Sequence, residues 1–207
     1  MNERPIIFNG EMVRAILDGR KTQTRRVMKP QPPPWHWWNA DAPTMRLAAQ
    51  FYPGEHGRKG CPYGIPGDRL WVRETTRVHK HLYDPTIDGA TYLATLTPVI
   101  GDKEHQYCGR AIWWYSKDVC PSIHMPKWAA RIWLEVTEVR VERVQDVSMH
   151  DALAEGADPK YSDFHDGSHC VGWFKRIWDN LSAKRGFAWD MNPWVWVIEF
   201  KILESKL

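Results

Sequence analysis

The stretch GRKTQTRR, residues 19–26, concentrates cationic and hydroxyl side chains, among them Lys21 and Thr24. A threonine hydroxyl can attack a carbonyl carbon when a neighbouring base removes its proton. A lysine can serve as that base when burial lowers its pKa. The stretch therefore supplies a candidate nucleophile, Thr24, and a candidate base, Lys21.

A candidate acidic partner lies at the end of a short predicted helix, residues 149–155. Ser148 is positioned to cap this helix, with Asp151 at the capping-box position and Gly156 just beyond the end. Glu155 then falls in the last turn, where the helix dipole disfavours an anion. An acid in that position suggests a role in a site, where it would orient a water or stabilise the charged lysine.

A purely structural interpretation of the same residues is also available. Arg20 and Lys21 suit a helix C terminus, Thr24 suits a strand, and Arg25 and Arg26 can be solvated. In a regular strand Lys21 and Thr24 would face opposite sides, so they share a site only if the chain bends between them. Taken alone, the residues favour this structural interpretation, because short motifs are weak signals.

Arg20, Arg25 and Arg26 can hold phosphate, so they are candidates for nucleotide or RNA binding. Four further residues are candidates for the same role. Trp71 and Arg73 share a strand face, where one side chain can stack on a base and the other can bind phosphate. His124 and Lys127 can line a nucleotide pocket or act as acid and base. The structural alternatives are a core tryptophan, an ion-paired arginine and a loop shaped by prolines. The aromatic residues at 35–38 (WHWW) can stack on a single strand or form a satellite cluster on the core.

Composition limits the class of protein. The chain has 207 residues, 43% of them hydrophobic, which is enough for a core. A formal net charge of +3 predicts local rather than extensive contact with nucleic acid. Thirteen tryptophans are available for packing, for stacking on bases, or for contact with guanidinium groups. No run of eighteen apolar residues and no signal-peptide pattern occurs, so we expect a cytoplasmic protein without a membrane partner.

Cysteine and histidine spacing does not predict a metal centre. The four cysteines are widely and irregularly spaced, without a C-x-x-C pair, so reduced thiols are expected. His79-x-His81 and Cys120-x-x-x-His124 offer possible ligands but complete no zinc pattern. We therefore predict no metal and no cofactor.

Hydrophobic periodicity predicts a small set of helices and strands. These elements are helices at 9–19, which Asn9 can cap, and at 171–185, and strands at 69–75, 132–144 and 194–203. Within 132–144 the alternation shifts phase after Val136, as a bulge or bend in a small barrel would require. No Gly-rich phosphate loop follows a strand, which argues against a doubly wound nucleotide-binding sheet. The expected class is α+β, a mixed β-barrel with packed helices.

Several of these segments together resemble the ASCH domain, a PUA-like barrel. They are the helix leading into GRKTQTRR, the Gly67-Asp68 turn, DVSMHDALAEG at 146–156, and the closing WVIEFKIL. The resemblance implies one domain over 1–207, with insertions at about 27–60 and 77–120, and an RNA-linked role. PSIHMPKW together with GDRLWVRET further resembles the longer ASCH-type proteins of phages and prophages.

Within that family, these residues resemble the pattern of the acetylcytidine amidohydrolases, which carry a G-R-K-T-x-T stretch and a later helix-terminal glutamate. This resemblance implies catalytic roles for Lys21, Thr24 and Glu155. The predicted function is therefore a hydrolase acting on an acylated nucleoside or on RNA. The alternative is a non-catalytic module that binds RNA or a modified nucleotide. A third possibility is that the insertions form a protein-interaction surface in a phage context, because the chain is much longer than a compact member.

Overall fold

The computed structural model describes residues 1–31, 60–83, 88–160 and 168–205, which form two compact units. Unit 1 comprises Met1–Asp18, Arg69–Glu135 and Ile202–Leu207, and unit 2 comprises Gly19–Asp68 and Val136–Lys201. The WHWW segment, for which we predicted stacking or core packing, lies outside the described residues, as does most of the predicted insertion at 27–60.

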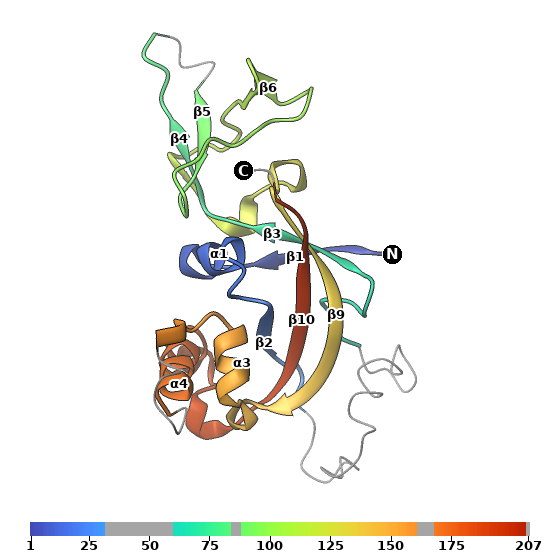
Figure 1. Cartoon of the computed structure of the whole chain (residues 1–207). Coiled ribbons are helices and arrows are strands. Elements are labelled where there is room, and N and C mark those ends of the chain that lie inside the picture. The colour runs from blue at the N-terminus through green and yellow to red at the C-terminus, as the bar shows by residue number, and fades with distance from the viewer. Residues whose placement is uncertain (32–59, 84–87, 161–167, 206–207) are drawn as a thin grey trace. The chain divides into compact units, whose positions relative to one another are not determined.

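The largest sheet has the strand order β1-β3-β9-β10-β2 (Figure 1). Its strands are β1 (Glu3–Ile7), β3 (Arg69–Arg73), β9 (Ile132–Arg143), β10 (Trp194–Ser205) and β2 (Gln23–Val27). In unit 1, β1 runs parallel to β3, and β3 runs antiparallel to β9. In unit 2, β10 runs antiparallel to β2, with Ile198 opposite Thr24.

The predicted α+β class is confirmed, but a closed barrel is not seen in the described part of the chain. Closure requires the two edge strands of a sheet to pair with each other. Here β1 and β2 stand at opposite ends of the strand order, and within the described ranges neither is paired with the other. Both edge strands are only five residues long, so each offers a short edge for pairing.

Unit 2 is built from β2, β10 and two helices. The helices are α3 (Met149–Ala154) and α4 (Ser168–Ser182), accompanied by the 3-10 turns Val144–Asp146, Ala183–Arg185 and Trp189–Met191. Figure 1 shows α3 and α4 side by side, and they share a hydrophobic core with β10. The buried members of this core are Val144, Val147, Ala152, Cys170, Phe174, Trp178, Val195 and Val197. This packing fixes the end of α3 beside β2.

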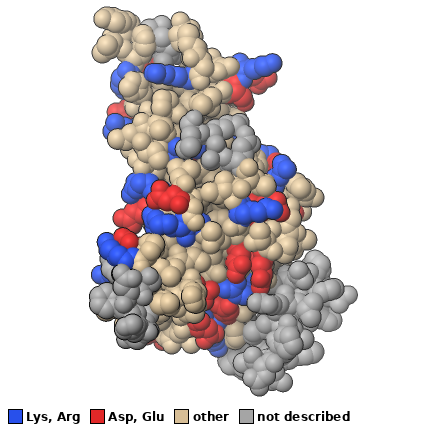
Figure 2. Space-filling view, in the orientation of Figure 1, with Lys and Arg blue, Asp and Glu red and all other residues tan. Residues whose placement is uncertain are grey.

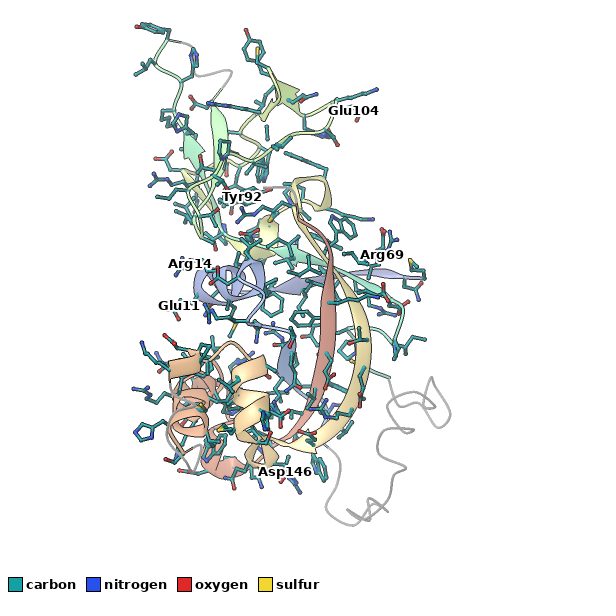
Figure 3. All side chains as sticks on the ribbon, in the orientation of Figure 1. Glu11, Arg14, Arg69, Tyr92, Glu104 and Asp146 are labelled. Atoms are coloured by element: carbon teal, nitrogen blue, oxygen red, sulfur yellow. The ribbon has the colours of Figure 1, made fainter. Side chains whose placement is uncertain are left out.

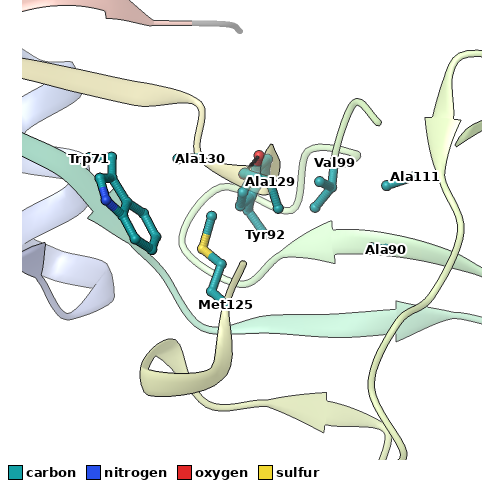
Figure 4. Packing of buried hydrophobic residues seen from close by; sticks show 8 residues of the cluster. All are labelled: Trp71, Ala90, Tyr92, Val99, Ala111, Met125, Ala129 and Ala130. Carbon is teal, nitrogen blue, oxygen red and sulfur yellow. Dashed lines mark hydrogen bonds between the residues drawn. The ribbon is translucent and has the colours of Figure 1, made fainter. Parts of the chain in front are cut away.

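Unit 1 contains α1 (Gly10–Leu17) and a second hydrophobic core. A three-stranded sheet of order β5-β4-β8 is formed by β5 (Gly89–Tyr92), β4 (Thr76–His79) and β8 (Val119–Cys120). A hairpin pairs β6 (Gln106–Tyr107) with β7 (Arg110–Ala111), and 3-10 turns lie at Ser122–His124 and Lys127–Ala129. Figure 4 shows the core residues Trp71, Ala90, Tyr92, Val99, Ala111, Met125, Ala129 and Ala130. The hydroxyl of Tyr92, labelled in Figure 3, donates to the carbonyl of Ala129 at 2.6 Å.

Local sequence signals locate most of these elements. The burial pattern of β9 shifts phase after Val136, with Val139 the next buried residue, so the predicted shift is confirmed. The helix predicted at 171–185 begins earlier, at Ser168, and its last turn is 3-10. β1 was not predicted, because its sequence ERPII contains a proline and only two aliphatic residues.

Cys61, Cys108, Cys120 and Cys170 carry free thiols, and all except Cys108 are buried. Among the helices in the described ranges, none has both the length and the apolar character needed to span a bilayer. On the face drawn in Figure 2, cationic and acidic side chains are interspersed, in keeping with the small net charge.

Candidate functional site

Backbone hydrogen bonds hold Lys21 at the C-terminal end of α3. The amide of Thr22 donates to the carbonyl of Ala154 at 2.9 Å, and the amide of Phe200 donates to the carbonyl of Thr22 at 2.8 Å. The segment that precedes β2 is therefore fixed between α3 and β10. In this position the Lys21 side chain is directed inward, and the residue is only 1% exposed.

The Lys21 ammonium donates three hydrogen bonds. Its Nζ lies 2.8 Å from the carbonyl of Gln23, 2.9 Å from the carbonyl of Glu155, and 2.7 Å from Oε2 of the Glu155 carboxylate. An ammonium has three N–H donors, whereas a neutral amine has two. Three acceptors around Nζ therefore match the protonated form of the lysine.

The pKa of Lys21 is nevertheless lowered from its usual value. Burial is the largest cause, because it disfavours the charged form. The nearby Glu155 carboxylate raises the pKa, while the charges of Arg26 and Arg25 lower it. The direction expected from the sequence is thus confirmed, together with the opposing effect of Glu155. Desolvation therefore favours loss of a proton from Lys21, whereas the three acceptors favour its retention.

Arg25 contacts the second oxygen of the same carboxylate. Its Nη1 lies 3.4 Å from Oε1 of Glu155, while its Nη2 lies 2.8 Å from Oε2 of Glu142 and 3.3 Å from Oδ2 of Asp151. The guanidinium carbon lies 5.7 Å from the centre of the Phe174 ring. Because the side chain is fully buried, its charge is compensated by these three carboxylates rather than by water.

Arg140 extends the charged network toward the edge of the sheet. It contacts the carboxylates of Glu142 and Glu199, and its Nη2 lies 3.0 Å from both Asp151 Oδ1 and Gln23 Oε1. Burial is the largest single effect on the carboxyl of Asp151, and it raises the pKa. Hydrogen bonds from Ser148, the charge of Arg25 and a hydrogen bond from Gln23 outweigh it and bring the pKa to about 2. At neutral pH Asp151 is therefore ionised, and its carboxylate is hydrogen-bonded within the network.

Thr24 occupies the opposite face of β2 from Gln23 and Arg25, because side chains alternate along a strand. It is 2% exposed. Among the residues that the structure describes, no hydrogen bond joins its hydroxyl to Lys21 or Glu155. The structure thus brings Lys21 and Glu155 together and places Arg25 beside them, with Thr24 directed away. The catalytic role of all three predicted residues stays a prediction.

Arg20 and Arg26 also have defined surroundings. Arg20 donates from Nη1 to the carbonyl of Gly156 at 2.9 Å. The favourable contact between a cation and a helix C terminus, which the structural interpretation invoked, is therefore present, but with α3 rather than α1. The guanidinium carbon of Arg26 lies 5.9 Å from the Tyr63 ring, and burial lowers the pKa of Arg26.

The candidates Trp71 and Arg73 belong to unit 1. Arg73 lies over the Trp71 ring at 5.0 Å, so the two share a face as predicted. Trp71 is only 8% exposed and forms part of the core shown in Figure 4. The Arg73 guanidinium donates to the carbonyl of Met125 at 3.1 and 3.2 Å. Both side chains therefore have contacts with other residues of unit 1.

The candidates His124 and Lys127 also belong to unit 1 and are exposed. The His124 ring stacks on Tyr115 with a centroid distance of 5.5 Å. Lys127 pairs with the Glu3 carboxylate and lies 5.7 Å from the ring of Trp133. Neither residue belongs to the unit that contains Lys21 and Glu155.

Sequence reasoning missed three charged residues of the network around Arg25 and Asp151, namely Arg140, Glu142 and Glu199. A signal was present, since Arg140 and Glu142 alternate with the buried Val139 and Val141 in one strand. Polar residues on one face of a half-buried strand require partners, but their identity depends on which strands pair. Within the described ranges, no cluster of three or more His, Cys, Asp or Glu side chains could hold a metal ion.

No protein-family model and no curated protein sequence matches the chain. One similar solved structure is protein EF3133 from Enterococcus faecalis V583, of the family DUF984, with 12% identity and a TM-score of 0.40. The match covers 100% of this chain and 82% of that protein. The chain is also similar in structure to an ASCH domain from Lactobacillus crispatus JV V101, with 13% identity, a TM-score of 0.38, and coverage of 99% of this chain and 81% of that domain.

Proposed function

We propose that the chain is an ASCH-type protein directed at RNA or nucleosides, and that it hydrolyses an acylated nucleoside or RNA through Lys21 and Glu155. The observation that carries this proposal is the 2.7 Å contact between the buried Lys21 Nζ and Glu155 Oε2. A buried lysine with a lowered pKa beside a carboxylate is typical of proton-transfer sites. In this proposal the chain is one PUA-like domain in which residues of about 27–60 and 77–120 are insertions.

The surroundings of Lys21 favour a particular division of roles in acyl hydrolysis. The ammonium of Lys21 donates a hydrogen bond to the carbonyl oxygen of the substrate as negative charge develops there. Glu155 accepts a proton from water while the water oxygen bonds to the carbonyl carbon. The bond from that carbon to the leaving nitrogen then breaks, and the proton passes from Glu155 to the nitrogen. Water takes the nucleophilic role that the sequence suggested for Thr24, because Thr24 lies on the opposite face of β2.

The test is a product screen with the full chain. Acetylcytidine, other acylated nucleosides and short RNAs are incubated with the protein, and products are identified by mass spectrometry. We expect turnover that falls at least about 100-fold in Lys21→Met and in Glu155→Gln, because an oxyanion donor and a general base each contribute rate factors of this order. The matched control is Lys175→Met, which removes an exposed lysine paired with Asp190. Wild-type turnover in Lys21→Met would contradict the assignment.

A second candidate function, non-catalytic binding of RNA, is favoured by a separate observation. Three cations of unit 2 lie over aromatic rings, with distances of 5.9 Å for Arg26 and Tyr63, 5.2 Å for Lys29 and Phe187, and 4.2 Å for Arg143 and Trp194. Adjacent aromatic and cationic groups suit the stacking and phosphate contacts of single-stranded RNA.

Salt dependence separates this second candidate from the first. Binding of a labelled single-stranded RNA is followed by fluorescence anisotropy at several salt concentrations. If the module only binds, no product forms, and the affinity falls steeply with salt. We then expect Lys29→Met to reduce the salt slope by about one, the change for one lost phosphate contact. An unchanged slope in Lys29→Met would exclude Lys29 from the binding surface.

A further inference from the structure

The three acceptors that surround Lys21 Nζ differ in how easily a ligand oxygen could displace them. Two are backbone carbonyls, of Gln23 and Glu155, which the strand and the helix end hold in place. The third is the Glu155 carboxylate, a side-chain group that rotates about its own bonds. A ligand oxygen can therefore reach a Lys21 N–H by replacing the carboxylate, while both carbonyls continue to hold the ammonium. Glu155 is 6% exposed, so the displaced carboxylate requires a new cationic partner within the protein.

Arg25 has a donor group positioned to be that partner. Its Nη2 is anchored by Glu142 at 2.8 Å and by Asp151 at 3.3 Å, whereas Nη1 faces Oε1 of Glu155 at 3.4 Å. The contact with Glu155 is the longest of the three, and it is 0.7 Å longer than the 2.7 Å contact between Glu155 and Lys21. Phe174 packs against the guanidinium and limits its movement. Arg25 is thus a fixed cation with one donor that can approach the carboxylate more closely.

We propose that Arg25 is the positioning residue of this site, which receives the Glu155 carboxylate when a ligand oxygen takes its place on Lys21. The inference rests on the proposed function of the Lys21 and Glu155 pair. Since Glu155 would stay beside a cation in both positions, its buried charge would never be left unpaired. A planar guanidinium presents two terminal nitrogens in a fixed geometry, so one can stay on Glu142 and Asp151 while the other receives Glu155.

The first test measures the pKa of Lys21 by an NMR pH titration of its ε-carbon in the full chain, without substrate. The charged groups that act on Lys21 are Glu155 from α3 and Arg25 and Arg26 from β2. In Arg25→Met the pKa of Lys21 should rise, because a cation is lost and Glu155 pairs with Lys21 alone. Arg140→Met is the matched control, since Arg140 shares Glu142 and Asp151 with Arg25 but has no contact with Glu155 among the described ion pairs.

Two results would overturn the proposal: an unchanged Lys21 pKa in Arg25→Met, or an equal shift in Arg140→Met. If Arg25→Met does not fold, Arg25→Lys replaces it. A lysine ends in a single nitrogen, so an ammonium that stays on Glu142 and Asp151 lacks the second nitrogen that faces Glu155, and the Lys21 pKa should again rise. An unchanged value in Arg25→Lys would equally overturn the proposal.

A second test uses any substrate that the product screen identifies. We expect Arg25→Met and Arg25→Lys to lower kcat at least tenfold with little change in KM, and to move the pH-rate profile upward with the Lys21 pKa. A purely structural role would reduce the folded fraction without moving that profile. If the screen finds no turnover, the proposed hydrolase function fails, while the NMR titration still decides whether Arg25 and Lys21 share Glu155.

Discussion

At the scale of single residues, each unit contains a buried ion pair. In unit 1, Arg131 and Glu74 form two hydrogen bonds of 2.9 and 2.8 Å, and both side chains are almost fully buried. Arg131 also bonds to Thr97 and lies 4.0 Å from the ring of Tyr92. Such pairs are costly to break, because removing one partner leaves an uncompensated charge inside the protein.

The Arg131 and Glu74 pair provides a direct stability prediction. We expect Arg131→Met to lower the free energy of unfolding by about 3–5 kcal/mol, as measured by urea denaturation. The double variant Glu74→Leu and Arg131→Met should recover most of that loss, because no unpaired charge remains. Lys127→Met, which removes a cation from an exposed pair with Glu3, serves as the control and should leave stability near the wild-type value. An additive loss in the double variant would show that packing, rather than charge, dominates at this position.

At the scale of elements, helix caps position the site. Ser148 accepts from the amide of Asp151 at 3.1 Å, and the Asp151 carboxylate accepts from the amide of Ser148 at 3.0 Å, so the predicted capping box is confirmed. The predicted cap of α1 is confirmed as well, since Asn9 accepts from the amide of Met12 at 2.8 Å. Both caps were evident in the sequence because capping depends on residues three apart in the chain.

The two caps form a matched pair for a second prediction. Ser148→Ala and Asn9→Ala should each lower the free energy of unfolding by about 1 kcal/mol, measured by thermal or urea denaturation. Only Ser148→Ala should also change the NMR titration of Lys21, because α3 carries Glu155 at its C-terminal end. If both variants alter the Lys21 titration equally, α3 is not the element that determines the environment of this lysine.

At the scale of the whole molecule, paired carboxylates make the free energy of unfolding depend on pH in the acidic range. The pKa values of Glu3, Asp88, Asp102 and Asp158 are lowered by hydrogen bonds from Lys127, the His81 backbone, His105 and Lys160 respectively. Asp151 has a pKa of about 2, compared with the ordinary value of 3.8. A carboxyl with a lowered pKa in the folded state stabilises the fold above its ordinary pKa, and this contribution is lost as pH falls.

Acid denaturation tests this relation. Between about pH 4 and pH 2 the unfolded chain binds more protons than the folded chain, so the free energy of unfolding should fall as pH decreases. Asp151 should account for about 1–2 kcal/mol of this fall, from the difference between its two pKa values after allowance for solvent screening. In Asp151→Asn the dependence on pH over this window should therefore be shallower. The same pH dependence in both proteins would show that Asp151 does not contribute.

The sequence by itself determined the features that depend on neighbours along the chain. These are the two helix caps, the phase shift in β9, and the identity of Lys21 and Glu155 as an unusual cation and acid. The neighbouring arginines also indicated a lowered pKa for Lys21 if that residue is buried, and burial is the largest cause of the shift.

Only the tertiary structure decided which side chains meet. β2 begins at Gln23, after Lys21, and strand alternation then directs Arg25 toward Glu155 and Thr24 to the other face. The carboxylates around Arg25 come from β9 and from α3, more than a hundred residues along the chain. Their arrangement depends on strand register and on the packing of α3 against β2, which are set by contacts between distant segments and leave no local pattern in the sequence.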